Sequence, residues 1–205
     1  FTAYTLVSLL LWPTWKAPAL TQTVSSLAEI QRRIIGHYFA RLAGAPDDSD
    51  SAKLRGQAAG ILASLPSVVD GAEVDSSEVW QLRRLWRRCT AQFVALNEAM
   101  EQWRLGFAEL AELDVARYLP HLPALGAEFD ARLAAVGPML AGKPPERRSI
   151  HIPLDFNQEA GASLSQFDRA ALMQARDQLQ RMDELTRELY DLFAGICGFG
   201  SEVQR

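Results

Sequence analysis

The chain has few of the residues that build stapled or metal-bound folds. Its 205 residues include 2 cysteines and 3 histidines. Cys89 and Cys197 form no CxxC pair and no disulfide framework, which favours a reducing compartment. His37, His121 and His151 lie far apart in the sequence and lack the paired spacing of zinc ligands. We therefore predict no metal site.

An excess of positive charge is also missing. Lys and Arg number 21 against 25 Asp and Glu, which gives a net charge of -4. Proteins that bind nucleic acid without sequence preference carry a basic excess, so we expect no nucleic-acid partner. The apolar fraction of 48% and the charged fraction of 22% are ordinary for globular chains. Disordered and fibrous classes are thereby excluded, and the length is sufficient for one domain with a sizeable core.

The motifs of common catalytic and nucleotide-binding sites do not occur. The sequence contains no GxxxxGK[ST], no HExxH, no Glu-x-x-His and no GxSxG. The glycines within 195–200 lie at the end of a predicted helix, whereas a dinucleotide fingerprint joins a strand to a helix. The acidic stretch 47–50 lacks the glycine and the distal glutamate of a calcium loop. We therefore predict no catalytic, cofactor-binding or metal-binding residues, and a protein that is not an enzyme.

The longest uncharged run is residues 1–15, before Lys16. It is shorter than the roughly 20 residues of a bilayer span and lacks the basic start and cleavage site of a signal peptide. Two interpretations remain open. The run is the end of a transmembrane helix with Trp12 and Trp15 at the membrane interface, or it is a short buried helix. We assign 1–15 as the apolar tail of a possible transmembrane helix and 16–205 as a single helical domain.

Helical periodicity dominates the remaining sequence. Apolar residues three or four apart predict helices over 20–43, from about 50 to 65, and over 122–140. A polar loop separates the first two, and we predict a second loop over 66–75, beginning at Pro66.

The clearest pattern is a strict alternation of three and four residues, typical of a coiled-coil seam. It occurs twice and predicts long helices over about 77–113 and 164–197, with Gly106 weakening the first. The first seam consists of Val79, Leu82, Trp86, Cys89, Phe93, Leu96, Met100, Trp103, Phe107 and Leu110. The second consists of Leu172, Ala175, Leu179, Met182, Thr186, Leu189, Phe193 and Ile196.

These patterns predict an all-α fold, a helical bundle whose two long helices pack antiparallel. Residues 149–154 alternate like a short extended segment, but Pro153 has no N–H and a central strand is unfavourable there. We therefore expect a strap that lies across helices. Ten seam positions exceed what the shorter helices are expected to cover, so we also predict a homo-oligomer.

Four arginines flank the first seam: Arg83, Arg84, Arg87 and Arg88. One interpretation is a contact patch for anionic lipid headgroups, an acidic partner or an anionic solute. The other is a solvated helix face paired with glutamates, the usual role of charge runs. The pair at 147–148 has the same two interpretations.

The order of these parts resembles the soluble region between the two membrane halves of the fusaric acid resistance and aromatic acid exporter family. The resemblance is carried by Leu-Leu-Trp-Pro at 10–13, Arg-Arg-Cys at 87–89, Leu-Asn-Glu-Ala at 96–99 and the extended stretch 150–155. These motifs are short, and no membrane half is present in the chain.

This resemblance implies a domain on the cytoplasmic side of a bacterial inner-membrane efflux transporter for aromatic carboxylic acids or related toxic compounds. Its partners would be the membrane halves of the same polypeptide, and the parent would work with a periplasmic adaptor protein. Transport would be driven by an ion gradient rather than ATP. The family's substrate residues are expected in the membrane part, so the implied role here is packing, oligomerisation or gating.

Two other functions compete with this one. A soluble helical scaffold or adaptor, acting through coiled-coil-like interfaces, explains both seams equally well. An enzyme with its active site in a helical bundle requires a buried ionisable cluster, and the sequence pattern indicates none.

Overall fold

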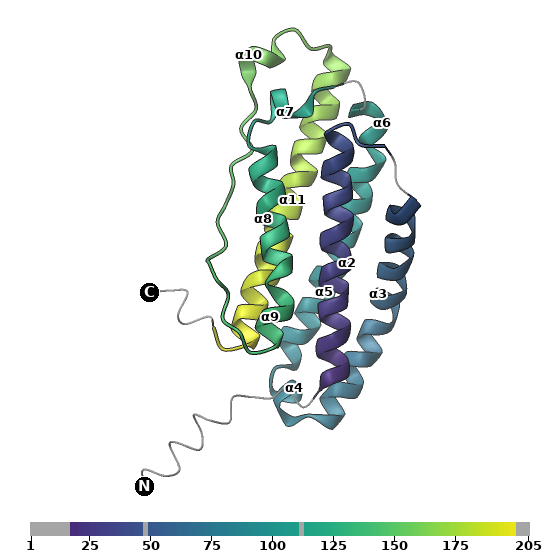
Figure 1. The fold of residues 1–205 in the computed structure, drawn as a ribbon, viewed down its shortest axis with the longest axis vertical. Helices are drawn as coiled ribbons and strands as arrows, with labels where there is room; N and C mark the ends of the chain where they lie inside the picture. The colour runs from purple at the N-terminus through teal and green to yellow at the C-terminus, as the bar shows by residue number, and fades with distance from the viewer. Residues whose placement is uncertain (1–16, 47–48, 111–112, 200–205) are drawn as a thin grey trace.

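The computed structural model describes residues 17–46, 49–110 and 113–199, and the interpretations of residues 1–15 lie outside these ranges. The regular secondary structure of the described residues is entirely helical and includes no strand, so the predicted all-α bundle is confirmed. The long helices run along one axis and are joined at the two ends of an elongated bundle (Figure 1). They are α2 (Pro18–Leu42), α3 (Ser49–Asp75), α5 (Arg83–Leu105), α8 (Leu122–Ala134) and α11 (Gln166–Ile196). Short helices are α4 (Ser77–Gln81), α6 (Phe107–Leu110), α7 (Val115–Tyr118), α9 (Val136–Leu140) and α10 (Gln158–Gly161).

The two predicted seams face each other in the interior. Every residue of the second seam is buried on α11, and every residue of the first is buried except the half-buried Leu82. The Phe193 ring on α11 contacts the rings of Trp86 and Phe93 on α5, with centroids 6.1 and 5.9 Å apart. The seams are therefore used within one chain. Self-association stays a prediction, but the buried seam residues cannot form the interface between two copies of the chain.

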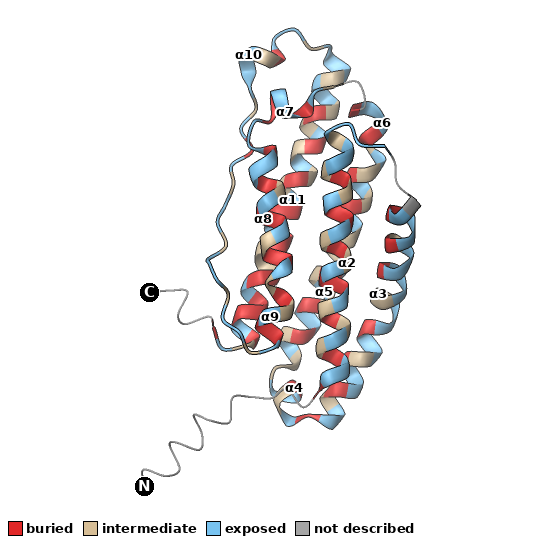
Figure 2. Cartoon of the chain, in the orientation of Figure 1, coloured by how far each residue is buried: buried red, intermediate tan, exposed pale blue. Residues whose placement is uncertain are grey.

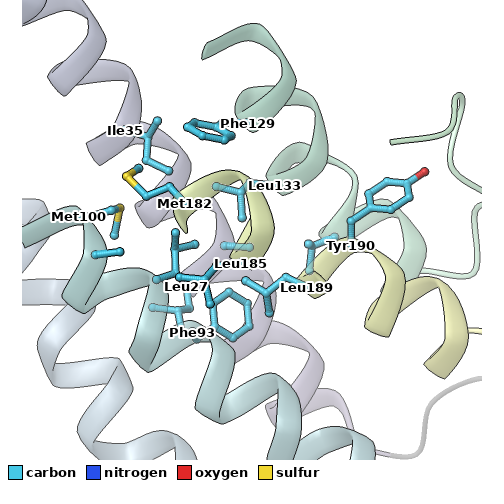
Figure 3. Packing of buried hydrophobic residues seen from close by; sticks show 14 of the residues in the cluster. Leu27, Ile35, Phe93, Met100, Phe129, Leu133, Met182, Leu185, Leu189 and Tyr190 are labelled. Carbon is cyan, nitrogen blue, oxygen red and sulfur yellow. The ribbon is translucent and has the colours of Figure 1, made fainter. Parts of the chain in front are cut away.

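The core forms where α2, α5, α8 and α11 converge. Figure 3 shows Leu27 of α2, Phe93 of α5, Leu133 of α8 and Leu185 of α11 packed into one cluster. Buried positions line the inner side of each long helix, and exposed positions line the outer side (Figure 2). Burial of this continuous apolar interior is the main source of the fold's stability.

The predicted helix 77–113 is interrupted twice. It is observed as α4, α5 and α6, with breaks at Leu82 and Gly106. Leu82 has φ -97° and ψ 11°, and Gly106 has φ -77° and ψ -6°. Gly106 lies in the right-handed helical region and Leu82 lies just outside it. Both breaks are short, and seam residues on either side of each break stay buried.

The loop predicted over 66–75 is wrong, because α3 continues through Pro66 to Asp75. Proline removes one backbone hydrogen bond from a helix, but the buried stripe that includes Leu65 continues beyond Pro66 at Val69 and Ala72. Burial of these three side chains against the bundle outweighs the local cost of proline.

Replacing Pro66 by alanine is expected to stabilise the protein by about 1–3 kcal/mol. The ring is exposed, and the change restores a helical N–H donor at little packing cost. Denaturant unfolding measures the gain. Ser67→Ala, at the neighbouring exposed position of the same helix, is the matched control and should change stability by under about 0.5 kcal/mol. Equal effects of the two substitutions would contradict this account of α3.

The predicted strap is observed as an irregular segment, residues 143–157, which runs from the end of α9 to α10 along the outside of α8 and α11 (Figure 1). Its backbone is held by hydrogen bonds to the helices. The Arg176 guanidinium donates to Leu154 O at 2.7 Å, and Asn157 N donates to Tyr118 O at 2.9 Å. The strap therefore does not need a strand partner.

Helices α2 and α5 run parallel and in register. Gln31 Nε2 donates to Phe93 O at 3.1 Å, a partner 62 residues ahead, and Tyr38 Oη donates to Glu101 at 3.3 Å, a partner 63 residues ahead. A constant offset of this size places the first residue of α2 beside α4. Figure 1 shows this start of α2 at the same end of the bundle as α4.

Helix α11 runs antiparallel to α5, as predicted. Arg88 pairs with Glu188, and Trp86, one half-turn earlier on α5, contacts Phe193, which is further along α11. The last turn of α11 therefore lies beside the first turn of α5. The start of α2 and the end of α11 consequently lie at the same end of the bundle, near α4 (Figure 1).

Candidate functional site

A buried arginine joins α8, α11 and the strap. Arg132 is 1% exposed and lies between the carboxylates of Glu128 and Asp183, each 2% exposed. Its Nε donates to Glu128 at 3.0 Å, and its Nη1 donates to Asp183 Oδ1 at 2.7 Å. Nη1 also donates to Thr186 Oγ1 at 2.9 Å, so the one polar position of the second seam accepts from this arginine.

The same cluster holds the strap. Arg132 donates to Ser149 Oγ and to Ile150 O, and Ile150 N donates to Glu128 Oε1 at 3.0 Å. We call Glu128, Arg132, Asp183 and Thr186, with these strap contacts, the arginine cluster. A buried charge is tolerated only when it is paired and hydrogen-bonded, and each charge here has such partners. The arrangement is therefore that of a structural clamp.

Two surface groups extend the cluster outward. Arg147 Nη1 lies 2.6 Å from Glu128 Oε2, and His151 Nδ1 lies 2.9 Å from Asp183 Oδ2. The side chains of Arg147 and His151 are 49% and 61% exposed. Both residues belong to the strap, so its charged side chains lie over the buried carboxylates.

Sequence reasoning missed this cluster. The expectation that no buried ionisable cluster exists is wrong, because three ionisable side chains are buried together here. Two signals pointed to it: the spacing of four between Glu128 and Arg132 on one helix, and the polar Thr186 within an apolar seam. Asp183, 51 residues from Arg132, could not be assigned to it from spacing alone.

A pocket of about 430 Å³ lies beside the arginine cluster. Small side chains of α8 and prolines of the strap line it, with Glu128, Arg132 and Tyr190 at its inner side. The Tyr190 hydroxyl donates to Arg147 O, which closes one side of the pocket. Glu128, Arg132 and Arg147 at this pocket already have partners within the protein, so none of these three is poised for proton transfer.

A second pocket, of about 580 Å³, lies at the opposite end of the bundle, between the end of α2 and the end of α5. The carboxylate of Glu101 contacts three of its lining residues. It accepts from Tyr38 Oη and from Arg104 Nε, and Arg55 Nε lies 3.6 Å away. Burial raises the pKa of Tyr38 to about 12. The carboxylate of Glu101 is thus already paired with side chains of the protein itself.

The four predicted contact arginines lie on the first two turns of α5, at the end of the bundle that carries α4. Arg87 forms a two-pronged ion pair with Glu73, and Arg88 pairs with Glu188. These two therefore follow the interpretation of a solvated face paired with glutamates. Arg83 and Arg84 differ: neither forms an ion pair with an acidic residue of the described chain.

The three histidines are not brought together. His37 lines the second pocket, His121 precedes α8, and His151 contacts Asp183. Among the described residues no group of three or more His, Cys, Asp or Glu has an arrangement able to hold a metal ion. Cys89 is buried in the seam, and burial raises the pKa of Cys89 and of Cys197 to about 12. A thiol with so high a pKa is a poor nucleophile at neutral pH.

The stability of the protein is expected to fall as the pH rises from 9 towards 12. The ordinary thiol pKa of 9.0 applies to the unfolded chain, whereas Cys89 and Cys197 have pKa values of about 12 when folded. Unfolding then releases protons in this interval, so the free energy of unfolding decreases with rising pH. Urea unfolding across this range measures the slope. The Cys89→Ala/Cys197→Ala variant should show a shallower slope, and an unchanged slope would exclude the thiols as its source.

The described helices were compared with the requirements of a membrane span, and none is both long enough and apolar enough to cross a bilayer. Comparison of the chain with protein-family models, curated proteins and solved structures finds no match in any of the three.

Proposed function

We propose that the chain is the cytoplasmic helical domain of an inner-membrane efflux transporter for aromatic carboxylic acids or related toxic compounds. Its role in this proposal is to pack between the two membrane halves of the transporter and to connect them rigidly. The family resemblance suggests the substrate class. The placement of the helices supports the role.

The observation that carries the proposal is the common location of the start of α2 and the end of α11. Both lie at the end of the bundle that carries α4 (Figure 1). A domain inserted between two membrane segments must receive and return the chain on the side that faces the bilayer. An elongated bundle with both connections at one end meets this requirement.

The arginine cluster supports a rigid connection rather than a hinge. It ties α8, α11 and the strap together through ionic hydrogen bonds that are buried from water. Separating Arg132 from Glu128 and Asp183 would leave its buried charge without a carboxylate partner, so local opening of this region is costly. Movement of one membrane half would then be passed through the bundle to the other.

The alternative is a helical scaffold that acts through coiled-coil-like interfaces. That function needs seam residues on the surface. The seam residues are instead covered by the chain's own helices, with Phe93 and Phe193 fully buried. The scaffold function therefore receives no support from the two seams.

The proposal is tested by export from cells that carry the complete gene. Cells lacking the gene are expected to accumulate more fusaric acid or benzoic acid, and to stop growing at lower concentrations, than cells that express it. Dissipating the proton gradient with a protonophore should remove this difference, because the proposed transport is driven by an ion gradient.

A neutral solute such as benzyl alcohol is the control, and its accumulation should not depend on the gene. Equal accumulation of the acids with and without the gene would contradict the proposed transport.

A further inference from the structure

Two large apolar side chains are exposed where α3, α4 and α5 meet. Val74 is 86% exposed and Trp80 is 53% exposed. Val74 lies in the last turn of α3, and Trp80 lies on α4. We call Val74, Trp80, Arg83 and Arg84 the α4 corner. Exposed large apolar side chains that gather at one place mark a candidate contact surface.

Cationic groups lie directly beside the exposed tryptophan. The Arg83 guanidinium lies over the Trp80 ring, 4.4 Å from its centroid, and donates to Trp80 O at 2.9 Å. Arg84 is exposed on the next position of α5. An indole ring with a guanidinium over its face and a second arginine nearby in sequence combines an apolar body with donors for phosphate oxygens.

Acidic groups are also present at the α4 corner. Asp75 is exposed at the end of α3, and the Glu78 carboxylate accepts from the hydroxyls of Ser76 and Ser77 at the start of α4. Glu78 is thus partly engaged by its own helix cap. The corner is therefore not strongly cationic as a whole, and a surface that accepts both Trp80 and the two arginines suits it better than a purely electrostatic partner.

The position of the α4 corner in the bundle indicates which partner surface it would contact. The register of α2 with α5 places the start of α2 beside α4, and the last turn of α11 lies beside the first turn of α5. Under the proposed function these are the points where the chain meets the membrane. The exposed Trp80 therefore lies at the level of the bilayer.

We infer that the α4 corner rests on the surface of a phospholipid bilayer, with Val74 and Trp80 at the boundary between headgroups and acyl chains and with Arg83 and Arg84 at the phosphates. This inference rests on the proposed function for the orientation of the bundle. It adds the lipid as a partner and assigns the residues that touch it. The contact would hold the bundle upright against the membrane.

The inference is tested with the full 205-residue chain and a fluorophore attached at one position. Val74→Cys is labelled with a polarity-sensitive maleimide dye, and Phe167→Cys is the matched control. Phe167 is 89% exposed and lies at the start of α11, at the opposite end of the bundle. The native thiols should react slowly, because burial raises the pKa of Cys89 and of Cys197 to about 12.

With vesicles of phosphatidylethanolamine and phosphatidylglycerol, the dye at position 74 is expected to shift to the blue and gain intensity, while the dye at position 167 stays unchanged. An equal response at both positions, a response at position 167 alone, or no response at either would each overturn the inference. An acidic protein partner in place of lipid would produce the last of these outcomes.

The contribution of the corner is measured by vesicle partitioning of unlabelled variants. Trp80→Ala is expected to lower the partition coefficient about tenfold. Arg83→Gln/Arg84→Gln is expected to lower it about 10- to 30-fold. Phe167→Ala, on the distant end, should leave it unchanged. Partitioning that is the same in all variants would assign vesicle binding to another part of the chain and overturn the inference.

Failure of the inference can be separated from failure of the proposed function. The vesicle measurements need neither export nor the rest of the transporter. Gene-dependent export together with no vesicle response at position 74 would remove the lipid contact and keep the transporter. A vesicle response at position 74 together with gene-independent accumulation would keep the lipid contact and remove the transporter.

Discussion

Replacing Arg132 by methionine is expected to destabilise the protein by about 3–5 kcal/mol. The change leaves the carboxylates of Glu128 and Asp183 buried without their shared cation. For a chain of this length the melting temperature should fall by about 6–20 °C. Thermal unfolding followed by circular dichroism measures the effect directly.

Arg32→Met is the matched control for this substitution. Arg32 also bridges two carboxylates, those of Glu29 and Asp130, but its side chain is 30% exposed. Water screens such a pair, so the expected loss is at most about 1 kcal/mol. Similar small losses for Arg32→Met and Arg132→Met would contradict the clamp assigned to the arginine cluster.

A second comparison separates the contribution of charge in the arginine cluster from the contribution of side-chain packing. Adding Glu128→Gln and Asp183→Asn to Arg132→Met removes the two carboxylates that the first change leaves without Arg132. The triple variant is expected to be more stable than Arg132→Met alone, because buried amides cost less than buried carboxylates that have lost their main cation. A further loss of stability on adding these two changes would argue that packing, rather than charge, dominates here.

Replacing Phe193 by alanine is expected to destabilise the protein by about 3–5 kcal/mol as well. The ring is fully buried and contacts Trp86 and Phe93, so its removal opens a cavity between the two seams. Denaturant unfolding gives the change in free energy. The cavity should lower the midpoint while leaving the denaturant slope nearly unchanged.

Phe167→Ala removes the same ring from the same helix at an exposed position, and is expected to change stability by under about 0.5 kcal/mol. The pair thus compares one residue type inside and outside the seam. A loss below about 1 kcal/mol for Phe193→Ala would mean that the seams are not the main stabilising contact between α5 and α11.

The long helices could be predicted from the sequence because their apolar spacing is regular over many turns. Each of the second seam's positions is buried, including Thr186, and α11 begins and ends within two residues of its predicted limits. In these helices local periodicity and tertiary burial agree.

The errors arose where tertiary packing overrides a local signal. Pro66 predicted the end of a helix, but Leu65 and Val69 on either side of it share one buried face. Periodicity also treats charged residues as solvent-facing, so the burial of Arg132 and Asp183 could not be predicted from it. Their pairing joins residues 51 apart, a distance over which spacing within one helix carries no information.

Within the described part of the chain, the four candidate surface arginines fall into a paired and an unpaired group, which the sequence could not separate for a similar reason. Sequence spacing placed all four beside the seam, but only the structure shows that Glu73 and Glu188 neutralise Arg87 and Arg88. The contact between Trp80 and Arg83 could not be predicted from the sequence either. The two residues lie on different helices, α4 and α5, and their relative placement depends on the turn at Leu82.

The most direct test of the account is the location of the protein expressed from its complete gene. The bundle is proposed to be held at a membrane through the end that carries the start of α2, the end of α11 and the α4 corner. After cell disruption and an alkaline carbonate wash, the account predicts that the protein stays in the membrane pellet. Recovery of the intact protein in the soluble fraction would contradict it.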